Sequence, residues 1–161
     1  MSEKRATYSP IFELAPDVEA LVRAGTPRSQ LAKNWLRFAS ALLAEDSSEI
    51  DLVVTPNARF HELEAIGFPP GPDGLKKFRE SINAGLRYEC VRVEAMRFEG
   101  LDIVETDLEC TVKHVGPLMG VPPTGRQVSF KVYTRNRFEN DRMAERWDRS
   151  DFDELMRQLS A

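Results

Sequence analysis

The chain has 161 residues, of which 42% are hydrophobic and 30% charged, a composition typical of one soluble globular domain. A domain of this length buries about two-thirds of its unfolded surface, so it does not need disulfide bonds for stability. The net charge of −4, without any cluster of basic residues, argues against nucleic acid as a partner, because sequence-independent binding needs a concentrated positive field.

Three helical segments are predicted after residues 1–10, which show no periodicity. Their ranges are 16–25, 29–45 and 47–54. The middle segment is the main helix, because its apolar residues recur at steps of three and four and form one face. That face consists of Leu31, Trp35, Phe38, Ala39 and Leu42.

The rest of the chain predicts one more helix and mostly strands. A short strand at 58–63 and a Gly- and Pro-rich loop at 66–73 precede a helix at 74–86, for which Asp73 is the expected N-cap. Strands are expected at 88–98, 103–114, 127–138 and 143–149, followed by a helical end at 152–159 capped by Asp151. Helices followed by antiparallel hairpins indicate an α+β fold.

The strand at 103–114 alternates most clearly. Val104, Leu108 and His114 share one face with Thr106, Cys110 and Val112, whereas the acidic residues share the other. This alternation places one side against a core or cavity and the other in water. We therefore expect a curved antiparallel sheet wrapped over the N-terminal helices, forming a cone with an apolar cavity suited to a small hydrophobic molecule.

Asp148 is the leading candidate for chemistry, because it follows Trp147 near the end of the last strand. A carboxylate that enters an apolar cavity becomes a stronger base. It can then remove a proton from a carbon next to a carbonyl group and return it to oxygen. The alternative is a solvent-facing Asp148 paired with a neighbouring arginine.

His114 and His61 are the only histidines of the chain. His114 could orient a substrate oxygen or exchange a proton with it, or it could hold the Pro- and Gly-rich loop through a hydrogen bond. His61 has the same two interpretations. No closely spaced ligand pair suggests a metal site, so we expect no metal.

Aromatic and apolar residues are expected to line the core or the cavity. They are Trp35, Phe38, Phe60, Phe68, Tyr88 and Met119. Tyr133 is out of phase with Val132 and Thr134, so its hydroxyl should point away from the cavity.

Cys90 and Cys110 lie equally far from a predicted turn near Gly100, which could bring them opposite each other across a hairpin. We expect two buried, reduced thiols, with a cross-strand disulfide as the alternative. No apolar run approaches the ~20 residues of a membrane span. Met1–Arg5 is charged without an apolar segment behind it, so the cytoplasm is the expected compartment.

Three segments together resemble the SnoaL-like polyketide cyclases, a branch of the NTF2-like fold. They are Gly71-Pro72-Asp73-Gly74-Leu75 with Phe78, the loop from His114-Val115-Gly116 to Pro122-Pro123-Thr124-Gly125-Arg126, and Glu145-Arg146-Trp147-Asp148 continuing through Asp151-Phe152 to Leu159. The resemblance runs from the helix near Leu31 to the end of the chain. It implies an N-terminal extension at 1–28 and an NTF2-like domain at 29–161.

In these cyclases an Asp on the last strand is the acid and base for intramolecular aldol closure of a polyketide ester, without a metal or organic cofactor. That position matches Asp148. The family also places a histidine on the preceding strand, where this chain has Thr134. Family members are commonly homo-oligomers, which implies a homodimer or a larger homo-oligomer here.

The leading hypothesis is a cofactor-free cyclase or isomerase acting on a hydrophobic carbonyl compound, with Asp148 and His114 as catalytic residues. The expected substrate-binding residues are Trp35, Phe38, Phe60, His61, Met119, Thr134 and Trp147. One alternative is a non-catalytic protein that binds a small hydrophobic ligand.

The other alternative is an epoxide hydrolase, which needs an Asp–Arg–Asp group holding a water molecule. Asp148, Arg149 and Asp151 are too close in sequence to form this group alone, although Arg135 or Arg137 could contribute.

Overall fold

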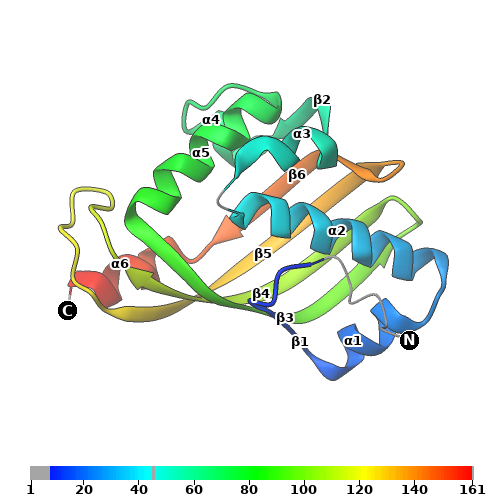
Figure 1. The fold of residues 1–161 in the computed structure, drawn as a ribbon, viewed down its shortest axis with the longest axis horizontal. Helices are drawn as coiled ribbons and strands as arrows, with labels where there is room; N and C mark the ends of the chain where they lie inside the picture. Colours follow the sequence, from blue (N-terminus) through cyan, green and yellow to red (C-terminus); the bar gives the residue numbers. More distant parts are fainter. Residues whose placement is uncertain (1–7, 45, 161) are drawn as a thin grey trace.

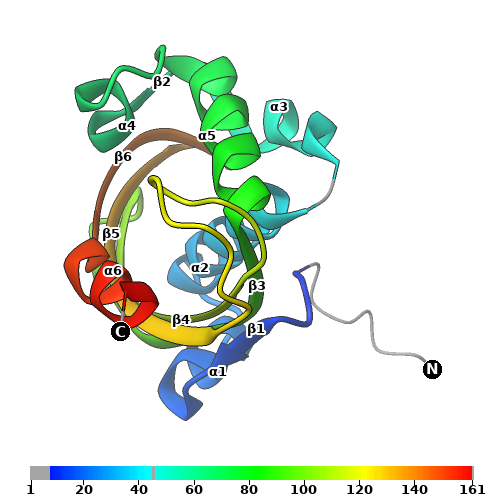
Figure 2. The same cartoon turned by 90° about the vertical axis from the view of Figure 1, so that its left-hand side faces the viewer.

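The computed structural model describes residues 8–44 and 46–160. They form a mixed α+β fold in which a strongly curved sheet wraps around helix α2 (Figure 1). Seen along the sheet, β3 to β6 trace an arc, with α2 inside it and α5 closing the open side (Figure 2). The expected α+β, NTF2-like cone is confirmed.

The helices and strands follow the predicted order, with two additions. The helices are α1 (Pro16–Arg23), α2 (Pro27–Leu43), α3 (Ile50–Val53), α4 (His61–Ala65), α5 (Gly71–Gly85) and α6 (Phe152–Ser160), with a short 3₁₀ turn at Ser47–Glu49. The strands are β1 (Phe12–Leu14), β2 (Val54–Phe60), β3 (Leu86–Glu99), β4 (Ile103–His114), β5 (Gln127–Glu139) and β6 (Arg142–Ser150).

The sheet has the order β1-β3-β4-β5-β6-β2. The four central strands pair antiparallel through hairpins, whereas the edge strands β1 and β2 run parallel to β3 and β6. The described part of the N-terminal extension therefore belongs to the sheet and to the core, because β1 pairs with β3 and Phe12, Val18 and Val22 are buried. The unperiodic residues 1–7 lie outside the described residues.

The prediction of a strand at 58–63 is wrong for its second half. β2 ends at Phe60, and His61 begins α4. The cause is local: the Glu64 carboxylate accepts a hydrogen bond from the Phe60 backbone N–H at 2.9 Å and holds Arg59 at 2.7 Å. This satisfies an amide that the first turn of a helix leaves without an intrahelical partner.

The expected caps have different outcomes. Asp151 accepts from the Glu154 backbone N–H at 3.2 Å, so it caps α6 as predicted. Asp73 does not cap α5, because that helix already begins at Gly71 and places Asp73 in its first turn. Gly74 permits this earlier start: a Cβ there would lie 1.7 Å from the Pro69 carbonyl oxygen.

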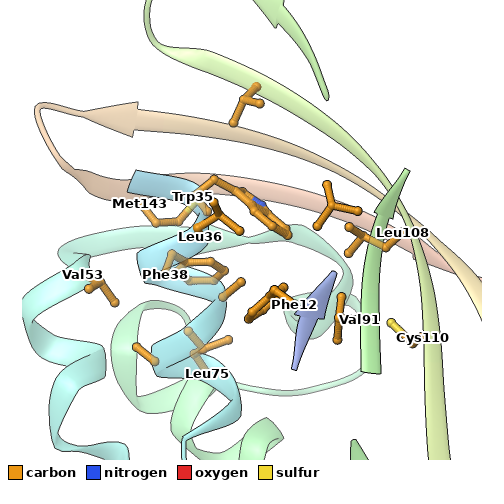
Figure 3. Close-up of a cluster of buried hydrophobic side chains, with 14 of the residues drawn as sticks. Phe12, Trp35, Leu36, Phe38, Val53, Leu75, Val91, Leu108, Cys110 and Met143 are labelled. Carbon is orange, nitrogen blue, oxygen red and sulfur yellow. The ribbon is translucent and has the colours of Figure 1, made fainter. Parts of the chain in front are cut away.

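One hydrophobic core lies between the helices and the concave face of the sheet. Figure 3 shows Trp35, Leu36 and Phe38 projecting from α2 among side chains of the sheet and of α5. Phe12 meets Trp35 edge-on, with ring centres 6.1 Å apart, and Phe38 stacks on Phe60 at 6.5 Å. Aromatic contacts of this kind fix the position of α2 over the sheet.

The two cysteines do not face each other. Cys90 pairs with Thr111 and Cys110 with Val91, because the hairpin closes with Glu99 opposite Ile103 and is therefore centred near residue 101 rather than at Gly100. Both thiols are free; Cys110 is buried and Cys90 is half-buried. An irregularity between Val93 and Ala95 shifts the register by one position toward the expected pairing, but the two cysteines still miss each other by one residue.

Candidate functional site

A cavity of about 80 Å³ lies between α2, α5 and the concave face of the sheet. Its wall is mostly apolar, with Phe12, Trp35, Phe38, Phe78, Leu108 and Val132 among its residues. Its two charged residues are Arg146 and Asp148. A smaller hollow of about 10 Å³ shares Phe78, Arg146 and Asp148 and adds Phe60, Glu62 and Leu63.

Alternation along β6 brings Arg146 and Asp148 to this cavity together. Residues two apart on a strand share a face, so Arg146, Asp148 and Ser150 all line it. Trp147 and Arg149 point to the outer face of the sheet. The expectation that Asp148 enters the concave interior is therefore met by the geometry.

Asp148 is held from three sides. Its side chain is 20% exposed, and its Oδ2 lies 3.8 Å from an Arg146 guanidinium nitrogen. Its backbone N–H donates to Glu62 Oε2 at 2.7 Å, which ties β6 to α4. Its strand partner is Thr134. The carboxylate thus occupies the boundary between the apolar wall and a small polar group.

A buried polar network lies next to Asp148 on β4 and β5. The hydroxyls of Thr106 and Thr134 are 2.5 Å apart, and Asn136 Nδ2 donates to Thr134 Oγ1 at 2.8 Å and to the Val104 carbonyl at 3.0 Å. All three side chains are fully buried. Thr134 is one of the expected substrate-binding residues, and the structure places it in this network rather than in the cavity wall.

Two further groups in the cavity wall stay neutral near pH 7. Burial raises the pKa of the Tyr88 hydroxyl far above its ordinary value, and Cys110 and Asp148 nearby add to this. Burial likewise raises the pKa of the Cys110 thiol to about 12. Tyr88 is therefore available as a hydrogen-bond donor, whereas Cys110 is a neutral thiol without nucleophilic character.

His114 is fully buried but lies outside the cavity wall. Its Nδ1 accepts from the Thr124 backbone N–H at 3.1 Å, and its backbone bonds Gly125 and Arg126. Gly116 lets the following loop approach α5, since a Cβ there would lie 1.9 Å from the Ala84 carbonyl oxygen. These contacts correspond to the loop-holding role considered for His114.

His61, Trp147 and Met119 also lie apart from the cavity. The His61 and Trp147 rings stack at 4.8 Å on the outer side of the sheet, and His61 Nε2 lies 2.7 Å from Glu145 Oε2. Met119 is 71% exposed at the tip of the loop after β4. Tyr133 bonds Glu105 on the outer face, as its phase predicts.

Of the expected site residues, the structure brings Trp35, Phe38 and Asp148 to one cavity, with Phe60 in the adjoining hollow. Sequence reasoning missed Arg146 and Glu62 and gave Tyr88 no polar role. The spacing of Arg146 and Asp148 was a usable signal, because two residues apart on a strand means the same face.

Other hollows on the molecule are of a different kind. One of about 520 Å³ lies on the outer face among Glu94, Asp107, Lys131 and Arg149, and it is wide and charged. In the part of the chain that the structure describes, no three His, Cys, Asp or Glu side chains are grouped to hold a metal ion. Among the described helices, none has the length and apolar character to cross a membrane.

Comparisons with known proteins agree with this architecture. TsrD from Streptomyces laurentii superposes with a TM-score of 0.72 at 22% identity, covering 83% of this chain and 97% of that one. AclR from Streptomyces galilaeus, described as a proposed hydroxylase, gives 0.65 at 24% identity over 84% and 98%. A proposed polyketide cyclase from Bacillus cereus gives 0.68 at 20% identity over 99% and 97%.

At these identities the structural matches show a shared fold. The search of curated proteins gave no match. The sequence pattern of the SnoaL-like polyketide cyclases matches residues 33–159, from the first turns of α2 to the end of α6. The chain therefore belongs to the SnoaL-like polyketide cyclase family, with the NTF2-like fold.

Proposed function

We propose that this protein is a cyclase or isomerase that acts on a small hydrophobic carbonyl compound, with Asp148 as general acid and base. The observation that carries the proposal is the position of the Asp148 carboxylate, in the wall of a mostly apolar cavity beside Arg146. Membership of the SnoaL-like family supports a reaction of this class.

The reaction needs two proton transfers. Asp148 takes a proton from the carbon next to a carbonyl group, and the electron pair of that C–H bond forms an enolate. In a cyclase, the enolate carbon attacks a second carbonyl carbon of the same molecule, forming a C–C bond and an alkoxide. Asp148 returns its proton to the alkoxide oxygen, so the carboxylate is regenerated.

The surroundings of Asp148 suit these steps. The aromatic wall of Trp35 and Phe38 excludes water, which protects an enolate from premature protonation. The neutral hydroxyl of Tyr88 can donate a hydrogen bond to a substrate oxygen. In this proposal His114 is structural: its ring accepts a hydrogen bond from Thr124 and so holds the loop after β4.

Exchange of α-protons in deuterated water tests the proposal without knowledge of the natural substrate. Single-ring methyl ketones are incubated with the protein, and deuterium incorporation is followed by NMR. Asp148→Asn should slow the exchange by about 10²- to 10⁴-fold, the usual worth of general acid–base catalysis. Asp151→Asn is the matched control, since Asn also caps helices and Asp151 lies outside the cavity. Equal exchange by Asp148→Asn and the wild type would refute the proposal.

A second candidate is activation of a water molecule, as in an epoxide hydrolase. Arg135 and Arg137 lie on the outer face and bind Glu99 and Glu145, so they are not the arginines of such a site. Arg146, Asp148 and Glu62 instead surround the hollow of about 10 Å³, which approaches the volume that one water needs. Incorporation of ¹⁸O from labelled water into the product of a small epoxide would distinguish this reaction from aldol chemistry.

A further inference from the structure

We propose that Arg146 and the indole N–H of Trp35 together bind an anionic oxygen, so that the cavity selects hydrophobic ligands carrying an enolate, phenolate or carboxylate group. The inference rests on the proposed function only in treating this cavity as the ligand site. Arg146 and Trp35 would recognise the ligand, whereas Asp148 would transfer the proton.

Arg146 is buried without a close ionic partner. Its side chain is 11% exposed, and its nearest carboxylate oxygen, on Asp148, is 3.8 Å away, which is beyond hydrogen-bond distance. Its Nε is buried and has no hydrogen-bond partner among the described residues. Its guanidinium lies over the Phe38 ring, 5.4 Å from the centre. Arg79 is also buried with unpartnered nitrogens among the described residues, but it does not line this cavity.

Several surface arginines are instead paired much more tightly. Arg97 holds Asp107 with bonds of 2.7 and 3.0 Å, and Arg59 holds Glu64 at 2.7 Å. These pairs are at the surface, where water would satisfy either partner. Arg146 has the opposite arrangement: a buried guanidinium with a free donor, which is costly unless something in the cavity accepts from it.

Trp35 also lines this cavity and carries a second unpartnered donor. Its side chain is 1% exposed, and its Nε1 is buried without a partner in the described part of the chain. An indole N–H can only donate, so it calls for an oxygen acceptor. Asn136 Oδ1 is also unpartnered among these residues, but Asn136 does not line the cavity. Two residues of the cavity wall, Arg146 and Trp35, therefore each carry a donor without an acceptor among the described residues.

Proton abstraction explains why such donors would be placed beside Asp148. When the carboxylate takes a proton, its negative charge passes to the oxygen of the substrate. A guanidinium next to both the Asp148 carboxylate and the substrate oxygen stabilises the negative charge before and after the transfer. Because the donor is already fixed in place, no free energy is spent on reorienting it. A ligand that is already anionic should then bind best when Asp148 carries no charge.

Binding of 4-nitrophenol tests the inference, because the absorbance of the phenolate reports how much of the bound probe is ionised. The wild-type protein should lower the apparent pKa of the bound probe relative to the free one. Arg146→Met should reduce the preference for phenolate over phenol by about ten- to a hundredfold, the worth of a charge-assisted hydrogen bond. Trp35→Phe, which keeps an aromatic ring, should reduce it less.

Arg149→Met is the matched control, because Arg149 lies on the same strand but over Tyr133 on the outer face. Asp148→Asn should bind the phenolate more tightly than the wild type does. An unchanged preference in Arg146→Met, or a wild-type preference for the neutral phenol, would overturn the inference.

A second measurement guards against an unfolded Arg146 variant. Benzoate and benzamide, which have the same shape, are compared on the wild-type protein by ligand-observed NMR, and benzoate should bind more tightly. Equal binding would contradict the inference even without a variant. Failure of the proposed catalysis is separate, since it is read from proton exchange in Asp148→Asn.

Discussion

Thr134 and Asp148 are paired directly across β5 and β6, and the Thr134 hydroxyl is bonded to Thr106 rather than to Asp148. The carboxylate therefore has a neutral hydrogen-bonded network on one side and a guanidinium on the other. The resemblance to the cyclases places a histidine where Thr134 stands. In the proposed site the polar partners of a ligand would come from other residues of the cavity wall, among them Asp148, Arg146, Trp35 and Tyr88.

Thr134→Val should destabilise the fold by about 1–3 kcal/mol, because Thr106 and Asn136 Nδ2 each lose a buried partner. Thr106→Val should have a similar cost. The double variant should cost less than the sum of the two, since two apolar groups of the same shape leave fewer unpaired hydroxyls. Urea unfolding of all four proteins gives the coupling free energy; strict additivity would contradict the network.

The ring of His114 should contribute to stability and not to the chemistry. His114→Ala leaves the Thr124 N–H without its acceptor and opens a cavity, so we expect a loss of about 2–4 kcal/mol. His114→Asn retains an acceptor near the Nδ1 position and should lose less. Both are compared by thermal unfolding. Loss of α-proton exchange in a stably folded His114→Asn protein would restore a catalytic role for this histidine.

The sequence was most informative where periodicity is long. The alternation in 103–114 and the apolar face around Trp35 predicted β4 and α2 within a few residues. The alternation along β6 also indicated the candidate site, since it places Arg146 and Asp148 on the same face of the strand. What periodicity could not give was the path of the chain between elements: β1 is only three residues long, and α4 begins at His61 because Glu64 bonds back to Phe60.

Local backbone geometry also explains why some expected site residues lie away from the cavity. Trp147 is adjacent to Asp148 in sequence, yet adjacent strand residues point to opposite faces, and so it stacks with His61 outside the cavity. Met119 lies at the tip of a turn with a φ of 48°, which no apolar pattern indicates. Cys90 misses Cys110 because the hairpin is centred near residue 101, and the single irregularity between that turn and Cys90 makes up only one of the two positions.

The thiols should differ in reactivity. Burial raises the pKa of Cys110 to about 12, whereas Cys90 is half-buried with a pKa raised less far, by burial and by its contact with Glu13. Iodoacetamide at pH 8 should therefore modify Cys90 slowly and Cys110 only after unfolding. Peptide mapping by mass spectrometry measures both. In Cys90→Ser the folded protein should resist labelling; rapid modification of Cys110 there would mean that the cavity is open to reagents.

Glu145 should make the fold sensitive to acid. Burial alone would raise the pKa of this carboxyl, but hydrogen bonds from His61 and Arg137 outweigh it and hold the pKa below its usual 4.5. A carboxyl group whose pKa is lower in the folded state stabilises the fold at pH values above its pKa in the unfolded state. This stabilisation is lost as the pH falls below 4.5 and through the pKa of the folded state. Glu145→Gln should thus lower the free energy of unfolding by about 1 kcal/mol at pH 7.

At pH 3 the difference between Glu145→Gln and the wild type should shrink, because the wild-type carboxyl is losing its charge as well. Glu139→Gln is the matched control: Glu139 binds the same Arg137 but is much more exposed, so its effect should be smaller at every pH. Urea titrations at several pH values between 3 and 7 measure both. A Glu145→Gln effect that is independent of pH would show that packing, rather than the charge of the Glu145 carboxylate beside Arg137 and His61, is what stabilises the outer face of β6.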